Sequence, residues 1–233
     1  MSNRSIHTLL KNWDEECPLT REEAVEVLNL PEEEMDSLME CAYALRTKYK
    51  GKKVSVQLLT NVRSGNCTQN CAYCAQSKDS QAEIEKYKRV SDEKLYGDND
   101  LVDEKHLARH CIGLSGIGFS DEEIEDLADR IREMKKKDTQ ICCSIGFLTE
   151  KQARILKDAG LDRINHNLNS SRSFYPEICT THTYDQRVNN IKMLQSLGFE
   201  ICSGGIVGMG ESKKDIVDML MDLREINPES VPI

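Results

Sequence analysis

The chain has 233 residues, a length that suits one or two ordinary domains and is ample for a sizeable hydrophobic core. A formal net charge of −9 leaves no broad phosphate-neutralising surface, which argues against a dedicated nucleic-acid binder. We find no bilayer-spanning apolar run and no charged-then-apolar leader, so we expect a cytoplasmic protein that binds neither nucleic acid nor membrane. In that compartment the ten cysteines favour metal binding or catalysis over disulfides.

Residues 1–51 are expected to form a helical extension. Thr20 stands before two acidic residues and an apolar run at helical spacing, which is typical of an N-cap and a first turn. Pro31 suits the first position of a second helix, and Gly51 marks its end.

Residues 52–233 alternate between short apolar segments and longer amphipathic ones. Repeated strand–helix units predict a parallel sheet, either doubly wound or closed into a barrel. The predicted strands are Val54–Asn61, His110–Ser115, Gln140–Gly146, Arg163–Leu168 and Glu200–Gly208. The predicted helices lie near Glu83–Lys88, Glu93–Arg109, Asp121–Lys137, Glu150–Ala159, Tyr184–Leu197 and Lys213–Glu225.

Alternation within these strands separates two faces, because successive strand residues point to opposite sides of a sheet. One face is small, polar or sulfur-bearing: Cys111, Gly113, Ser115, Cys142, Ser144, Gly146, Asn165, Asn167, Asn169, Cys202 and Gly204. The other face is mostly apolar and suits packing against helices. An ordinary barrel fills its axis with Val, Ile and Leu, so this pattern predicts a sheet closed around a polar cavity, that is, a ligand-holding barrel.

Three cysteines, Cys67, Cys71 and Cys74, directly follow the first predicted strand with gaps of three and two residues. Three thiolates can hold three irons of a [4Fe–4S] cluster and leave the fourth iron open. A structural zinc site would need a fourth Cys or His close by, and His106 is the next one along the chain. A zinc knuckle or incidental cysteines are the alternatives.

This cysteine loop, with an aromatic residue before its last Cys, resembles the signature of radical S-adenosylmethionine (SAM) enzymes. Further segments resemble the biotin synthases, from about residue 19 to the last residue. They are Asn61–Gly65, Ala75–Ser77, Asn165–Asn169, Tyr175–Glu177, Thr180–Tyr184, Cys202–Gly208 and Glu229–Ile233. The implied fold is an α/β, TIM-barrel-type (β/α) radical SAM barrel over residues 52–233, incomplete, with about five to six strands.

The resemblance also implies the ligands. Cys67, Cys71 and Cys74 would hold the [4Fe–4S] cluster, whose open iron chelates SAM. The matching SAM-binding residues are Tyr73, Asn167, Asn169, Arg187, Gly204, Ile206, Gly208 and Glu211. Arg187 would pair with the SAM carboxylate, a role that suits a planar bidentate donor. Asn169 replaces an Asp that binds the SAM ribose in many members.

The resemblance implies a second site for substrate and sulfur. Asn165 and Asn167 would contact dethiobiotin. Cys111, Cys142 and Cys202 would ligate an auxiliary iron–sulfur cluster, [2Fe–2S] or another type, that donates the sulfur of biotin. The reaction would draw on a one-electron donor such as flavodoxin or ferredoxin, and we expect a homodimer.

Several of these residues have structural alternatives. Asn165 and Asn167 could satisfy backbone groups, the glycines from Gly204 to Gly210 could serve turns, and Arg187 could be exposed on its helix. Gly208-Met-Gly210 echoes a dinucleotide fingerprint but lacks its third glycine. The outward parity of His166 and Cys143 predicts a satisfied structural histidine and a packing thiol. Cys17, Cys41 and Cys179 lack partners in the motif pattern and are interpreted as incidental.

The chain departs from the family in two places. It stops at Ile233, where a sixth strand should begin, before an Asn that binds dethiobiotin and, in many members, an Arg ligand of the auxiliary cluster. Residues 96–101 place a Gly and turn-prone residues where the family has an Ala-rich helix. Three hypotheses follow: a biotin synthase-type enzyme, a related radical SAM enzyme acting on another small substrate, or a non-catalytic iron–sulfur-binding remnant.

Overall fold

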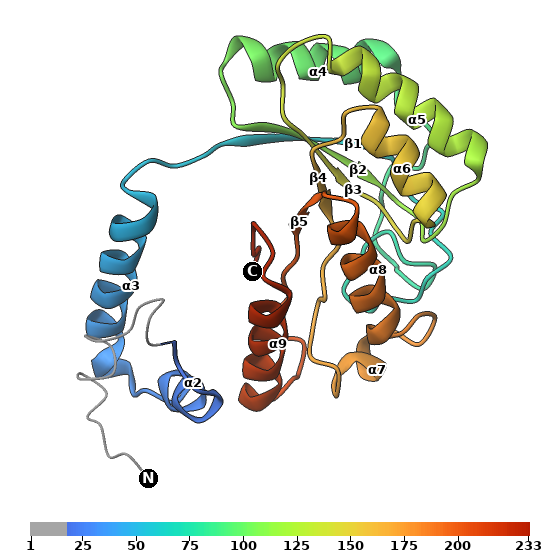
Figure 1. The fold of residues 1–233 in the computed structure, drawn as a ribbon. Coiled ribbons are helices and arrows are strands. Elements are labelled where there is room, and N and C mark those ends of the chain that lie inside the picture. Colours follow the sequence, from blue (N-terminus) through green and yellow to red (C-terminus); the bar gives the residue numbers. More distant parts are fainter. Residues whose placement is uncertain (1–17) are drawn as a thin grey trace.

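A parallel sheet organises the computed structural model, which describes residues 18–233 (Figure 1). Its strands are β1 (Gln57–Arg63), β2 (Arg109–Leu114), β3 (Ile141–Ser144), β4 (Arg163–Asn165) and β5 (Glu200–Cys202). Each strand pairs with the next one along the chain, in the order β1-β2-β3-β4-β5. The sheet therefore grows in one direction, as in a barrel, but β1 and β5 do not pair with each other, so the closed sheet expected from strand alternation is not formed. The predicted α/β partial barrel is confirmed.

Helices cover one face of this sheet. They are α4 (Asp92–Glu104), α5 (Asp121–Met134), α6 (Glu150–Asp158), α7 (Tyr175–Ile178), α8 (Tyr184–Ser196) and α9 (Lys213–Ile226). The five longer ones begin at a Ser or Thr whose side chain accepts a hydrogen bond from a backbone N–H in the first turn: Ser91, Ser120, Thr149, Thr183 and Ser212. These caps fix where each helix starts after its strand.

The core lies between the sheet and these helices. Ile112, Cys143, Ile164 and Ile201, all of the outward parity, are fully buried and belong to one hydrophobic cluster. The residues that alternate with them along the strands face the other side. There Gly113 is half-buried and Ser144 is exposed, whereas Cys142 is buried. The predicted division of the strands into an apolar and a polar face is confirmed, as is the packing role of Cys143.

The N-terminal segment forms two helices that reach from one edge of the sheet toward the other (Figure 1). They are α2 (Arg21–Leu28) and α3 (Met35–Lys50), joined by the 3₁₀ turn η1 (Glu32–Glu34). α2 packs on α9, where Arg224 Nη1 donates to the Leu19 carbonyl at 2.7 Å and Arg21 pairs with Asp218. The division at residue 51 stays a prediction, and Cys17 lies outside the described residues.

Three local predictions were wrong. Residues 83–88 are not a helix, because Tyr87 forms an antiparallel bridge with Ser64. Pro31 caps the 3₁₀ turn instead of opening α3. Residues 96–101 do not interrupt α4, which runs through Gly97 without a break. The strands β4 and β5 also end earlier than predicted, so Asn167, Asn169 and Gly204 lie on the segments that follow them.

Residues 230–232 run parallel to β5. Ser230 bridges Cys202, and the N–H groups of Ser203 and Gly205 donate to the carbonyls of Ser230 and Pro232 at 3.0 and 3.1 Å. Position 204 must be glycine here, because a Cβ atom would lie 1.8 Å from the Pro232 carbonyl oxygen. This segment therefore occupies the place predicted for a sixth strand.

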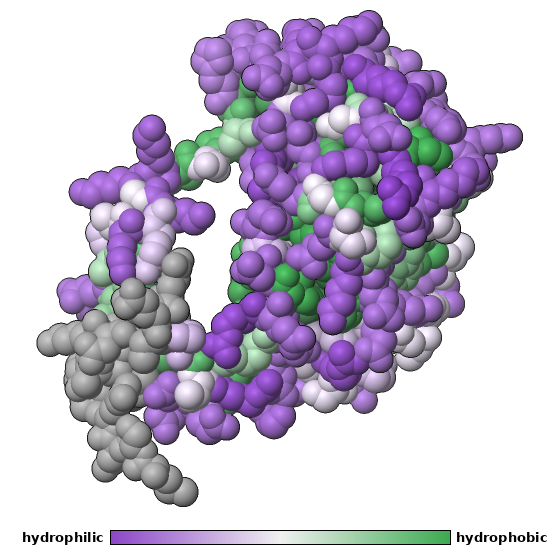
Figure 2. Space-filling model, in the orientation of Figure 1, coloured by the Kyte–Doolittle hydropathy of each residue, from purple (hydrophilic) through white to green (hydrophobic). Residues whose placement is uncertain are grey.

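Hydrophilic and hydrophobic residues are unevenly distributed over the surface. In Figure 2 hydrophilic residues cover most of the outer face, whereas hydrophobic residues gather beside the hollow between the N-terminal helices and the sheet. Both open edges carry exposed apolar side chains, Leu59 on β1 and Val231 and Ile233 beside β5. Within residues 18–233, every helix is too short or too polar to cross a membrane.

Candidate functional site

A cavity of about 290 Å³ opens at the carboxyl ends of the strands. Its floor comes from the small residues of the polar strand face, including Gly113, Ser144 and Gly146. Cys67, Cys71 and Cys74 line it from the loop after β1. Tyr73, Asn165, Asn167, Asn169 and Arg187 line it as well. The structure thus brings together the three loop cysteines and five of the residues assigned to SAM or substrate.

The cysteine loop is held by the segment that contains α7. The Asn70 side chain bonds to Thr180 and Thr181, with Nδ2 donating to Thr180 Oγ1 at 2.7 Å. The Ala72 N–H donates to the Ile178 carbonyl at 2.9 Å. These contacts join positions more than a hundred residues apart and fix the loop over the cavity.

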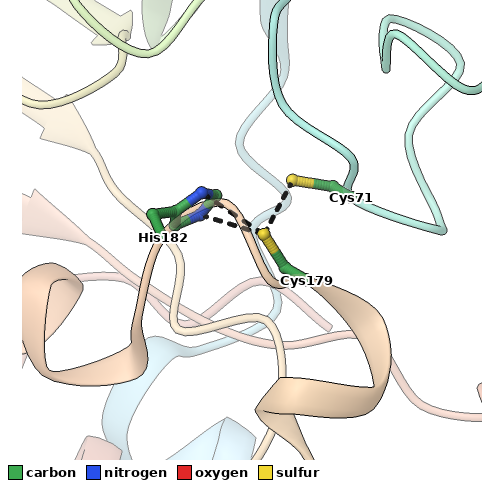
Figure 3. A group of neighbouring side chains, drawn as sticks. All are labelled: Cys71, Cys179 and His182. Atoms are coloured by element: carbon green, nitrogen blue, oxygen red, sulfur yellow. Dashed lines mark hydrogen bonds between the residues drawn. The ribbon is translucent and has the colours of Figure 1, made fainter.

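The three loop cysteines differ in exposure. Cys71 is buried, whereas Cys67 and Cys74 are half-buried. Burial and the neighbouring Cys179 thiol raise the pKa of Cys71 to about 12. Among the described residues, the one group of His, Cys or carboxylate ligands close enough to share a single ion is Cys71, Cys179 and His182, not the three loop cysteines (Figure 3). The role of Cys67, Cys71 and Cys74 as cluster ligands stays a prediction.

Arg187 lines the cavity and makes several hydrogen bonds there. Its guanidinium donates to Tyr175 Oη at 2.6 Å, to the Asn167 carbonyl at 3.1 Å and to His182 Nε2 at 2.7 Å. The alternative of a plainly exposed helix arginine is therefore wrong. A fixed cation that faces a polar cavity is suited to hold an anionic ligand.

Asn167 and Asn169, on the segment after β4, differ in whether their side chains have hydrogen-bond partners. Asn167 Oδ1 accepts from the Gly204 N–H at 3.1 Å, so it does serve a backbone group. Asn169 is 4% exposed, adopts a left-handed backbone with φ of 71°, and its Nδ2 has no partner in the described part of the chain. A buried donor without a partner costs free energy unless a ligand satisfies it. Asn169 is therefore ready to donate to a bound molecule.

Four residues assigned to SAM do not line this cavity. Gly204, Ile206, Gly208 and Glu211 lie on the segment between β5 and α9. The Glu211 carboxylate accepts from the N–H groups of Gly208 and Met209 at 2.6 and 2.7 Å. Burial raises the pKa of Glu211, but the backbone hydrogen bonds outweigh burial, so the pKa is lowered overall. The glycines and Glu211 thus build a turn, and their contact with SAM stays a prediction.

The three deeper cysteines share the polar strand face but lie outside the cavity lining. Cys111 and Cys142 stand opposite each other on β2 and β3, and Cys202 stands opposite Asn165, whose Nδ2 lies 3.2 Å from its sulfur. The hydrogen bond with Cys142 lowers the pKa of Cys111 to about 7, against burial and with the charges of Arg109 and Arg163. The same hydrogen bond, together with burial, raises the pKa of Cys142.

The sequence interpretation missed Cys179 and His182. Cys179, interpreted from the sequence as incidental, is buried, and its Sγ lies 3.8 Å from that of Cys71. The Cys-x2-His spacing of residues 179–182 was the available signal. His166 is buried, as expected of a structural histidine, and its ring nitrogens have no side-chain partner within residues 18–233. Burial, and then the charge of Arg187, lower its pKa to about 3, against a hydrogen bond with the Ile145 backbone that raises it.

Comparisons with known proteins agree with this architecture. The chain is 40% identical over 216 residues to a biotin synthase of Geobacillus kaustophilus (strain HTA426), covering 92% of this chain and 65% of that protein. It is 40% identical over 217 residues to a biotin synthase of Rhodopirellula baltica, covering 93% and 60%. The chain thus spans less than two thirds of the length of these relatives.

A solved structure identifies the fold of the chain, and a family model identifies its family. The crystal structure of methylornithine synthase (PylB) superposes with a TM-score of 0.84 at 16% identity, over 97% of this chain and 66% of that one, which places the chain in the same α/β fold. The family model described as the Radical SAM superfamily matches residues 61–223. The chain belongs to the radical SAM superfamily.

Proposed function

We propose that this chain performs the SAM-dependent part of a biotin synthase-type reaction, in which sulfur is inserted into dethiobiotin. The carrying observation is the cavity itself, which Cys67, Cys71 and Cys74 line together with Arg187 and Asn169. Three cysteines, a cation and an unpartnered amide donor around one cavity match the chemistry of an iron–sulfur cluster and an amino acid-derived ligand. The similarity to biotin synthases supports the choice of substrate.

Each group of residues has a distinct task in this proposal. Cys67, Cys71 and Cys74 would hold the [4Fe–4S] cluster, which supplies the reductive cleavage of SAM to methionine and a 5′-deoxyadenosyl radical. Arg187 would bind the SAM carboxylate with its planar fork, oriented by Tyr175. Tyr73, whose pKa is raised by burial, stays neutral and offers an aromatic face for the adenine.

The deeper face would receive the substrate and the sulfur source. Asn165 and Asn167 would orient dethiobiotin between SAM and the strand cysteines. Cys111, Cys142 and Cys202 would hold an auxiliary cluster, [2Fe–2S] or another type, that supplies the sulfur. A flavodoxin or ferredoxin would serve as electron donor. A homodimer and a cytoplasmic location remain predictions.

The gap between β1 and the segment 230–232 sets a limit on the activity of this chain. The deeper cysteines lie on a sheet that does not close into a barrel, so water would reach an auxiliary cluster and make it labile. We therefore expect the chain alone to cleave SAM reductively and to form little or no biotin. The C-terminal third of a curated relative, fused or added in trans, should restore sulfur insertion.

An anaerobic assay tests both the reductive cleavage of SAM and the need for the added segment in biotin formation. Reconstituted chain is incubated with dithionite, SAM and dethiobiotin, and 5′-deoxyadenosine and biotin are quantified with and without the added segment. 5′-Deoxyadenosine from the chain alone, with biotin appearing only when the segment is present, is the expected result. No 5′-deoxyadenosine in any arm would contradict the radical SAM assignment. Robust biotin formation by the chain alone would contradict the need for the added segment.

A further inference from the structure

We propose that Cys71, Cys179 and His182 form a second metal site, specific for a thiophilic divalent cation of the zinc type, that competes with cluster assembly for Cys71. The three residues come from two segments far apart in sequence. Cys71 lies on the cysteine loop, and the other two lie between α7 and α8 (Figure 3). All three are buried, and their ligand atoms lie within 4.8 Å of one another.

The separations that involve Cys179 fit a tetrahedral zinc centre, and the Cys71–His182 pair lies within 4.8 Å. Zinc bonds of about 2.3 Å to sulfur and about 2.0–2.1 Å to nitrogen place two sulfurs about 3.8 Å apart, and a sulfur and a nitrogen about 3.5 Å apart. In this chain the Sγ atoms of Cys71 and Cys179 are 3.8 Å apart. The ring nitrogens Nδ1 and Nε2 of His182 lie 3.3 and 3.8 Å from Cys179 Sγ. Two thiols and an imidazole at these separations are the soft donor set that zinc prefers.

The surroundings of His182 suit a ligand histidine. A metal-bound imidazole needs a second partner for its other nitrogen, which fixes the ring. Gln69 Oε1 lies 2.9 Å from Nδ1, and Tyr175 Oη lies 2.8 Å from Nε2. Arg187 Nη2 also donates to Nε2 at 2.7 Å, and this hydrogen bond would have to break for a metal to bind, because binding through Nε2 takes its lone pair and binding through Nδ1 leaves the proton on Nε2. The nitrogen that does not bind the metal would then keep Gln69 or Tyr175 as its partner.

A fourth ligand would come from the cavity. Cys71 and His182 both line the cavity of about 290 Å³, so water or a small ligand can reach a metal bound there. Because one thiolate of Cys71 cannot serve both centres, zinc in this site would exclude the [4Fe–4S] cluster. The site thus distinguishes a zinc-loaded chain from a cluster-loaded one.

Cobalt(II) is the probe, because its tetrahedral thiolate complexes absorb in the visible and near ultraviolet. The metal-free chain is titrated with Co²⁺ under argon after removal of reductant, and Zn²⁺ is then added to displace the cobalt. We expect one equivalent of Co²⁺ with sulfur-to-cobalt absorption, fully reversed by Zn²⁺. Since this arm uses metal-free protein, its result does not depend on any radical SAM activity.

Variants separate this site from the cysteine loop. Cys179→Ser and His182→Gln should each lose the cobalt bands, whereas the double variant Cys67→Ser/Cys74→Ser should keep them with the same stoichiometry. Circular dichroism on each variant verifies the fold, and the double variant keeps the test decisive if either single variant is unstable. Bands that persist in Cys179→Ser would show that cobalt binds other cysteines, and bands that vanish in the double variant would place it on the cysteine loop. Either result would overturn the proposal.

Discussion

Asn99 on α4 lies with its Oδ1 3.1 Å from Nδ1 of His110 on β2, and both side chains are almost fully buried. The other ring nitrogen of His110 lies 2.9 Å from Thr60 Oγ1, which donates to Asp98 at 2.6 Å. The polar residues that predicted a broken helix therefore form a network that ties α4 to two strands. They stabilise α4 in its place instead of interrupting it.

Replacing Asn99 by Ala should lower the free energy of unfolding by about 1–3 kcal/mol, since it leaves the buried Nδ1 of His110 without its partner and removes one of the hydrogen bonds to the Met134 carbonyl. Asp100→Ala on the same helix is the matched control. Asp100 forms only an exposed ion pair with Lys137, so its loss should cost less than about 1 kcal/mol. Urea unfolding measures both. Equal effects of the two substitutions would show that the network does not stabilise the fold.

Much of the fold could be predicted because its signals are local. The order of strands and helices follows from the change between periods of two and 3.6 residues, and the caps at Ser120 and Thr149 are visible in the sequence. The polar strand face follows from alternation alone. The cysteine loop was found because its three candidate ligands lie within eight residues.

What the sequence left open depends on contacts between distant segments. Residues 83–88 have helical spacing, but Tyr87 pairs with Ser64 and the chain stays extended. Cys179 lies 108 residues after Cys71, so no motif links the two. The unpartnered Nδ2 of Asn169 follows from a left-handed backbone that only the folded chain defines.

The alternation of strand residues predicts that substitutions on the two faces of the sheet differ in their effect on stability. Ile164 on β4 is fully buried against the helices, so Ile164→Ala should destabilise the fold by about 2–5 kcal/mol. Ser144 on β3 points to the open, polar side, and Ser144→Ala should change stability by less than about 0.5 kcal/mol. Thermal or urea unfolding decides the comparison. A large loss from Ser144→Ala would mean that the two faces are assigned wrongly.

Arg187→Lys should weaken SAM binding about 10- to 100-fold, because the lysine keeps the charge but loses the fork held by Tyr175 and Asn167. Equilibrium dialysis with labelled SAM on reconstituted protein measures the affinity, with iron content matched first. Arg154→Lys is the control, because Arg154 on α6 pairs only with the exposed Glu150. Unchanged affinity in Arg187→Lys would remove Arg187 from the SAM site.

Asp215 should make stability depend on acid pH. The hydroxyls of Ser173, Ser212 and Ser171 donate to its carboxylate at 2.6–2.7 Å and hold its pKa well below the usual range. A carboxyl with a lowered folded-state pKa stabilises the fold above its unfolded-state pKa of about 3.9 and loses this effect as the pH falls further. Asp215→Asn should therefore be less stable than the wild type by about 1–2 kcal/mol at pH 6, with a smaller gap near pH 3. Urea unfolding from pH 6 to 3 tests this, and a gap independent of pH would contradict it.

The most direct test of the account is the electron paramagnetic resonance spectrum of the anaerobically reconstituted, dithionite-reduced chain, recorded with and without SAM. The chain should show a reduced [4Fe–4S] signal that changes shape when SAM is added, because the ligand binds the open iron beside Arg187. Replacing Cys67, Cys71 or Cys74 by Ala should abolish that SAM-dependent change. If all three variants kept the change and still formed 5′-deoxyadenosine, the cysteine loop would not be the cluster site.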